Sequence, residues 1–206
     1  MGRLCLETRK KKMQQNNIIN HRQFIRENKP VEFSVATLEK IRQLIRRYPE
    51  GRQKSALLPV LHMAQEELGG YLSADVMDYV AALLGIQPIE VYEVATFYSM
   101  FYLEKMGNYV IEVCRTGPCA ISGGEKILDH LRDVLEIEPG ETTSDGLFTL
   151  KEVECLGSCG TGPAMQVNTV YYEHLTPGKV DKILEDLRTY ANRDKPGDSS
   201  WAEKFC

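Results

Sequence analysis

The sequence has no apolar run long enough to cross a lipid bilayer and no excess of positive charge. A membrane-spanning helix needs about 20 consecutive apolar residues, and polar residues interrupt every hydrophobic stretch of this chain. The formal net charge of −4 offers no general attraction to nucleic acid. We therefore expect no nucleic-acid partner and no direct membrane contact, so that any connection to a membrane is made through a partner protein.

A secretory signal is also missing, because no apolar segment follows the N-terminal charges. We therefore expect a reducing compartment, in which closely spaced cysteines indicate metal or redox chemistry more often than disulfides. The acidic Glu7 and the lack of an amphipathic stripe argue against a mitochondrial transit peptide. Of the six cysteines, Cys5 and Cys206 lie in polar end segments and are predicted to be exposed thiols with no ligand role.

Residues 34–102 carry apolar side chains at helical spacing. The pattern predicts four helices, over 38–48, 55–68, 73–84 and 88–98, with Ser55 and Ser73 as N-caps and Pro88 in a first turn. These helices form a predicted bundle at 34–107. Residues 1–33 lack such periodicity and are predicted to be a disordered or weakly ordered tail.

After Gly107 the hydrophobic period changes from about 3.6 to 2, which indicates a new domain. The pattern predicts strands at 109–113 and 147–153, a hairpin of strands 164–167 and 170–175, and two helices, the first opened by a capping box of Ser122 and Glu125. This order is expected to give a mixed sheet covered by two helices, in a thioredoxin-like arrangement over 108–190, with a polar tail at 191–206. The expected fold class is α+β, an N-terminal helical bundle followed by a thioredoxin-like mixed-sheet domain.

Four cysteines form the chemically informative motif: Cys114 and Cys119 are separated by four residues, and Cys155 and Cys159 by three. Each pair follows a predicted strand, so both pairs can meet at one edge of the sheet. Glycines beside them, among them Gly157 and Gly162, would let backbone N–H groups approach negatively charged sulfur atoms. This pattern favours a [2Fe–2S] cluster, which four thiolates hold.

Three other interpretations of the four cysteines stay open on spacing alone. A four-cysteine zinc site is one, although such sites usually have two-residue gaps. Two disulfides would require an oxidising compartment. A thiol–disulfide oxidoreductase would need two cysteines separated by two residues at the start of a helix, which neither pair offers.

Together with the phrase Val94-Ala-Thr-Phe-Tyr98 and the stretch from Cys155 to Ala164, the cysteine spacing resembles a known family. The chain is similar, over about 34–190, to the small [2Fe–2S] subunit of NADH:quinone oxidoreductase, respiratory complex I. The resemblance implies that Cys114, Cys119, Cys155 and Cys159 ligate one [2Fe–2S] cluster. It also implies a thioredoxin-like ferredoxin domain that transfers electrons and has no catalytic site of its own.

The resemblance further implies a partner subunit that carries FMN, NADH and a [4Fe–4S] cluster, with other peripheral-arm subunits beyond it. The cluster of this chain would exchange electrons with that flavin, on the cytoplasmic side of a bacterial inner membrane rather than in the mitochondrial matrix. The same module resembles small subunits of NAD-dependent formate dehydrogenases and of NAD-linked or bifurcating hydrogenases. A zinc-stabilised interaction module is the alternative from another functional class.

Overall fold

The computed structural model describes residues 24–191 of the chain, which divides into two compact units. Of the described residues, one unit comprises 24–68 with Leu72–Phe97, and the other comprises Gly69–Tyr71 with 98–191. The predicted division of the chain at 107/108 remains a prediction. Cys5, Cys206 and most of both predicted tails lie outside the described residues.

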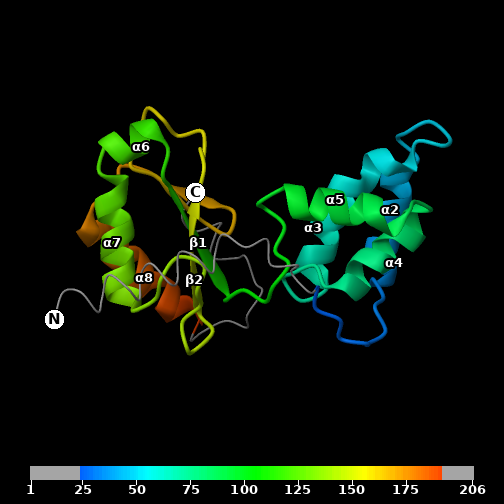
Figure 1. Cartoon of the computed structure of the whole chain (residues 1–206), viewed down its shortest axis with the longest axis horizontal. Helices are drawn as coiled ribbons and strands as arrows, with labels where there is room; N and C mark the ends of the chain where they lie inside the picture. The colour runs from blue at the N-terminus through cyan, green and yellow to red at the C-terminus, as the bar shows by residue number, and fades with distance from the viewer. Residues whose placement is uncertain (1–23, 192–206) are drawn as a thin grey trace, which may run out of the picture. The chain divides into compact units, whose positions relative to one another are not determined.

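The first unit is built from helices, as the sequence predicts. They are α2 (Val35–Ile45), the short 3-10 helix η1 (Gln53–Ala56), α3 (Leu57–Glu67), α4 (Ala74–Leu84) and α5 (Pro88–Phe97). Figure 1 shows α2 to α5 in blue to green. Their apolar stripes meet in one core, in which the largest fully buried side chains are Ile41, Leu61, Leu72 and Met77.

The starts predicted at Ser73 and Pro88 are confirmed, whereas the first helix runs over Val35–Ile45 instead of 38–48. Ser73 caps α4 by accepting a hydrogen bond from the Val76 N–H at 3.3 Å, and Gly85 ends that helix in the left-handed conformation, with φ of 63°. The predicted cap at Ser55 is wrong, since no side chain caps α3, which begins at Leu57. Residues 53–56 already turn as a 3-10 helix that leads directly into α3, so Ser55 lies inside that turn.

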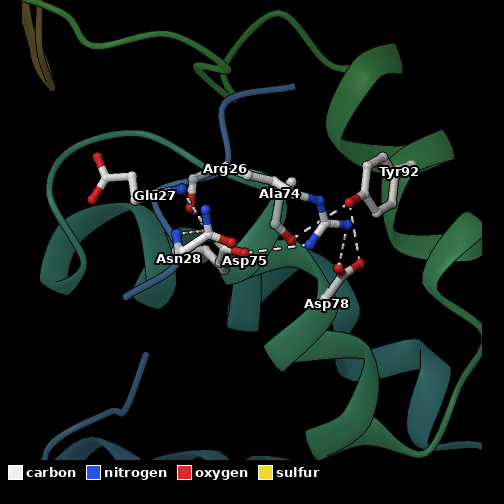
Figure 2. Close-up of polar contacts among 9 residues, drawn as sticks. Arg26, Glu27, Asn28, Ala74, Asp75, Asp78 and Tyr92 are labelled. Carbon is white, nitrogen blue, oxygen red and sulfur yellow. Dashed lines mark hydrogen bonds and ion pairs between the residues drawn. The ribbon is translucent and has the colours of Figure 1, made fainter. Parts of the chain in front are cut away.

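Residues 24–33, which are predicted from the sequence to belong to a tail, contain no helix or strand but are held by specific contacts. The Asp75 carboxylate accepts hydrogen bonds from the backbone N–H of Glu27 at 2.7 Å and of Asn28 at 3.1 Å. Arg26 reaches both Asp75, at 3.3 Å, and Asp78, at 2.8 Å (Figure 2). The segment is thus fastened to the first two turns of α4.

Replacing Asp75 by alanine is expected to destabilise the protein by about 1–2 kcal/mol. The substitution leaves two backbone N–H groups and Arg26 without their shared acceptor, and it removes the acidic residue of the first turn of α4. Urea unfolding measures the change. Glu39→Ala is the control, because Glu39 makes only exposed contacts within its own helix, an ion pair with Arg42 at 3.7 Å and a hydrogen bond from the Gln43 side chain at 3.4 Å. Equal stability of the two variants would contradict the role given to Asp75.

The second unit contains a four-stranded mixed sheet with strand order β2-β1-β3-β4. Strand β1 (Tyr109–Cys114) pairs in parallel with β2 (Phe148–Val153) and antiparallel with β3 (Met165–Val167), which pairs antiparallel with β4 (Val170–Tyr172). Helices α7 (Gly124–Leu135) and α8 (Pro177–Ala191) contact one another and share a core with the sheet (Figure 1). The expected α+β architecture with a thioredoxin-like mixed sheet is confirmed.

One local prediction in this unit is wrong. Ser122 does not open α7 through a capping box, because its hydroxyl donates to the Pro118 carbonyl at 2.7 Å. The N-cap of α7 is Gly123, in the left-handed conformation with φ of 103°. A short helix that the sequence pattern does not predict, α6 (Gly117–Ile121), precedes it, and Ser122 ends that helix instead of starting the next.

Candidate iron–sulfur site

The four motif cysteines lie on two segments that leave the same edge of the sheet. Cys114 is the last residue of β1, and Cys119 lies in α6, which follows it. Cys155 and Cys159 lie in the loop after β2. Because β1 and β2 are parallel, with Cys114 opposite Val153, both segments begin at the carboxyl ends of neighbouring strands.

The four thiols are arranged as two pairs. Cys114 and Cys119 are both buried, each 2% exposed. Cys155 and Cys159 are both exposed, and their Sγ atoms are 3.7 Å apart. Between residues 24 and 191, no three histidine, cysteine or acidic side chains are grouped closely enough to hold a single metal ion.

The second cysteine loop packs against the first pair. An added Cβ atom on Gly162 would be 3.3 Å from the Cys119 Sγ atom, so a larger residue there would require one of the two segments to shift by a few tenths of an ångström. Leu156 packs on the buried cluster of Cys114, Cys119 and Ala164. The Cys114 N–H donates to the Ala164 carbonyl at 3.2 Å. These contacts bring the two cysteine segments together in one site.

Backbone N–H groups face the sulfur atoms, which is the environment that thiolates require. The Gly157 N–H donates to the Cys155 Sγ at 3.3 Å, as the sequence suggested for this glycine. The backbone at Leu156 and Thr116 also lowers the pKa of Cys114, and the backbone at Ala164 lowers that of Cys119. The sequence pattern did not predict these three groups.

The Thr116 hydroxyl is a further group that sequence reasoning missed. Its Oγ1 atom is 3.3 Å from the Cys114 Sγ. Burial raises the pKa of Cys114, but hydrogen bonds from this hydroxyl and from backbone N–H groups outweigh the burial and lower it. Thr116 lies between the two cysteines of the first pair, and no spacing signal distinguished it from its neighbours.

In each pair one thiol has a lowered pKa and the other a raised pKa. Burial and then the neighbouring Cys114 raise the pKa of Cys119. The backbone N–H of Gly157 and then the Cys159 thiol lower the pKa of Cys155, which in turn raises that of Cys159. In each pair one thiol therefore loses its proton more easily than the other, and a bound metal would displace the protons of both.

The charged side chains next to the cysteines are paired. Arg115 lies 3.6 Å from Glu152 and 3.3 Å from Glu154, so it offsets the two carboxylates that flank the second loop. Glu112 is buried, and its burial raises its pKa although Lys151 lies 3.6 Å away. The backbone N–H groups are thus the donors directed at the sulfurs themselves.

The donor set fits an iron–sulfur cluster. A [2Fe–2S] cluster takes four thiolates, two on each iron, and two thiol pairs at one sheet edge match that division. Hydrogen bonds to the sulfurs and partial burial are the features by which a protein stabilises such a cluster and tunes its potential. Within the described part of the chain, no helix has the length and apolar character needed to cross a membrane.

Comparison with known proteins agrees with this chemistry. The chain is 42% identical over 156 residues to a subunit of the NADH-quinone oxidoreductase of Rickettsia conorii, covering 76% of this chain and 93% of that one. It is 41% identical over 162 residues to the mitochondrial NADH dehydrogenase (ubiquinone) flavoprotein 2 of Dictyostelium discoideum, covering 79% of this chain and 66% of that one.

The solved structure of an NAD⁺-reducing [NiFe]-hydrogenase in the H₂-reduced state has a similar fold, with a TM-score of 0.58 and 23% sequence identity. That likeness covers 65% of this chain and 22% of the other, and at this identity it supports the fold alone. The family model of the thioredoxin-like [2Fe–2S] ferredoxins matches residues 41–188. The chain therefore belongs to the thioredoxin-like [2Fe–2S] ferredoxin family, whose cofactor is a [2Fe–2S] cluster.

Proposed function

We propose that this chain is an electron-transfer subunit of an NADH:quinone oxidoreductase, and that Cys114, Cys119, Cys155 and Cys159 ligate its [2Fe–2S] cluster. The observation that carries the proposal is that these four thiols lie as two pairs on the segments that follow neighbouring parallel strands, where a backbone N–H donates to one of the sulfurs. The relatives in Rickettsia and Dictyostelium, named as parts of that oxidoreductase, support the choice of complex.

When bound, the cluster supplies a one-electron redox couple. The buried thiols of Cys114 and Cys119 and the exposed thiols of Cys155 and Cys159 would hold it, and the exposed pair makes the site accessible to a partner protein. The chain itself then needs no general acid, base or nucleophile.

The partner that we propose is a subunit that carries FMN, NADH and a [4Fe–4S] cluster, joined to the other peripheral-arm subunits. The chain would then act as a peripheral subunit on the cytoplasmic side of a bacterial inner membrane. An NAD-dependent formate dehydrogenase or a hydrogenase with the same module is the alternative, which co-purification of the chain with its partners distinguishes.

The cofactor and its ligands are tested on the purified full-length chain. We expect about two irons and two acid-labile sulfides per chain, a reddish-brown colour and bleaching by dithionite. A colourless protein that carries about one zinc ion per chain would instead support the interaction-module alternative. NADH should reduce the cluster only after the flavin subunit is added, and reduction by NADH without it would contradict the proposed division of roles.

An exposed apolar side chain near the site predicts where the partner binds. Ile121, two residues after Cys119, is 91% exposed on α6. Ile121→Lys is expected to weaken the flavin subunit's binding about tenfold, because a charged side chain would replace an apolar contact in a dry interface. The spectrum and potential of the isolated chain should not change. The interaction is measured by titration with the flavin subunit.

Val35→Lys is the matched control for this experiment. Val35 is 84% exposed on α2, in the other unit of the chain, so the substitution exchanges an equally accessible apolar side chain for the same charge. Equal weakening by both substitutions, or none by Ile121→Lys, would contradict a partner surface beside Cys119.

A further inference from the structure

Two hydroxyl groups of the second cysteine loop bind the same carboxylate oxygen. Ser158, which lies between Cys155 and Cys159, donates to the Glu173 Oε1 atom. Thr161 Oγ1 lies 2.5 Å from that oxygen. Glu173 directly follows strand β4 and is far from the loop in sequence. Its half-buried side chain therefore links the loop, which follows β2, to the end of β4, the edge strand on the opposite side of the sheet.

Backbone hydrogen bonds hold the same two segments together. The His174 N–H donates to the Thr161 carbonyl at 2.7 Å, and the Leu175 N–H donates to the Pro163 carbonyl at 3.1 Å. Lys179 Nζ donates to the Glu173 carbonyl at 2.6 Å, which fixes the backbone of Glu173. These contacts fix the backbone around Glu173, while its carboxylate accepts the hydrogen bonds of the two hydroxyls.

The protonation of this group decides which way the hydroxyls point. Hydrogen bonds from Ser158 and then Thr161 hold the pKa of Glu173 below its usual range. The side chain is therefore ionised at neutral pH, and a carboxylate only accepts hydrogen bonds. The Ser158 hydroxyl then donates to Glu173, and the Thr161 hydroxyl donates to Glu173 at 2.5 Å, with the Ser158 carbonyl as a longer second acceptor at 3.3 Å. Neither hydroxyl is directed at the sulfur of Cys155 or Cys159.

We infer that Glu173 is a positioning residue for the cluster, one that fixes the Cys155–Cys159 loop through Ser158 and Thr161 and keeps their hydroxyls off the sulfurs. The inference rests on the ligand set of the proposed function. Two features of this arrangement lower the reduction potential of the cluster: a fixed negative charge near the loop, and the absence of hydroxyl donors at the sulfurs. Both favour the oxidised cluster.

Two substitutions in the full-length protein separate the charge from the positioning. Glu173→Gln keeps an acceptor oxygen of the same reach but removes the charge, so the midpoint potential should become more positive. Glu173→Ala also frees both hydroxyls. We expect a larger positive shift, a changed EPR spectrum of the reduced cluster, and cluster loss to a chelator that is about tenfold faster.

Glu185→Gln, at an exposed position of α8, is the control for a general charge change and should leave the potential, spectrum and rate of loss as in the wild type. The decisive variant removes both hydroxyls, as Ser158→Ala with Thr161→Val. In that background Glu173→Ala should shift the potential clearly less than it does in the wild type, because the two effects share one contact.

The outcomes separate the inference from the proposed function. A wild-type chain without an iron–sulfur cluster would refute the proposed function itself. A wild-type chain with the cluster, combined with a Glu173→Ala variant of unchanged potential and spectrum, would overturn only the positioning role. The positioning role is also overturned if Glu173→Ala accelerates cluster loss while potential and spectrum stay constant, since that result indicates a structural contact alone.

Discussion

Cys119→Ala is expected to lower the cluster content of the purified protein by an order of magnitude or more. Losing a residue that merely orients a metal ligand already costs about 10–100-fold in affinity, and this substitution removes a proposed ligand itself. The Cys119 thiol is buried against Gly162 and Ala164, so solvent has little access to its position. Iron and sulfide analysis, together with the visible spectrum, measures the loss.

Alanine is chosen instead of serine because a serine oxygen can itself bind iron. Cys206→Ala is the control, since the sequence assigns that cysteine no ligand role, and it should retain the wild-type cluster content. Circular dichroism of the Cys119→Ala protein should show retained helix and sheet, because the core of the second unit lies between the sheet and α7 and α8. Full cluster content in Cys119→Ala would remove this residue from the ligand set.

Much of the fold is readable from hydrophobic periodicity. The helical spacing before residue 100 and the alternation after Gly107 predicted the four main helices of the first unit and the mixed sheet of the second. Such patterns work because burial of one face dictates them locally. Local caps with no competing partner, such as Ser73 on α4, were predicted for the same reason.

The failed predictions involve side chains whose best partner is not the one that the local pattern suggests. Ser122 fits a capping box, but the carbonyl of Pro118 in the unpredicted helix α6 takes its hydroxyl. Ser55 fits an N-cap, but it lies inside a 3-10 turn. The contacts that hold residues 24–33 have no signal in the sequence for a different reason: their partners, Asp75 and Asp78, are about fifty positions away along the chain. The predicted tail itself remains a prediction.

In the candidate site, too, some features were predictable from the sequence and others were not. The pairing of the cysteines was predictable, because each pair follows a strand and neighbouring parallel strands end at one edge. The groups that surround them were not predictable, because Thr116 and Glu173 carry no spacing signal. Their roles depend on the distances that the folded chain creates between segments.

Gly124→Ala is the substitution outside the proposed ligands with the largest expected effect. Gly124 is the first residue of α7, and an added Cβ atom would be 2.9 Å from the Cys119 carbonyl oxygen, 3.1 Å from its carbonyl carbon and 3.2 Å from the Cys114 carbonyl oxygen. These are backbone atoms, which cannot rotate away as a side chain would. The helix and the Cys114–Cys119 segment must therefore separate.

The expected cost is about 2–3 kcal/mol of folding stability, the upper part of the range for overpacking a tight site. Alanine in place of glycine would by itself stabilise a helix by about 0.5–1 kcal/mol, so the clash outweighs the gain. Because the displaced backbone carries Cys114 and Cys119, cluster content should fall together with stability. Urea unfolding and iron analysis of the same preparation measure both.

Gly117→Ala is the matched control, because Gly117 lies in the same cysteine segment, yet an added Cβ atom there meets nothing within 4 Å. In α6 this substitution should be neutral or slightly stabilising and should keep the cluster. The two glycines thus predict effects of opposite sign from the same chemical change. If Gly124→Ala were as stable and as rich in iron as Gly117→Ala, the start of α7 would not be in tight contact with the Cys114–Cys119 backbone. That result would contradict the close packing on which this prediction depends.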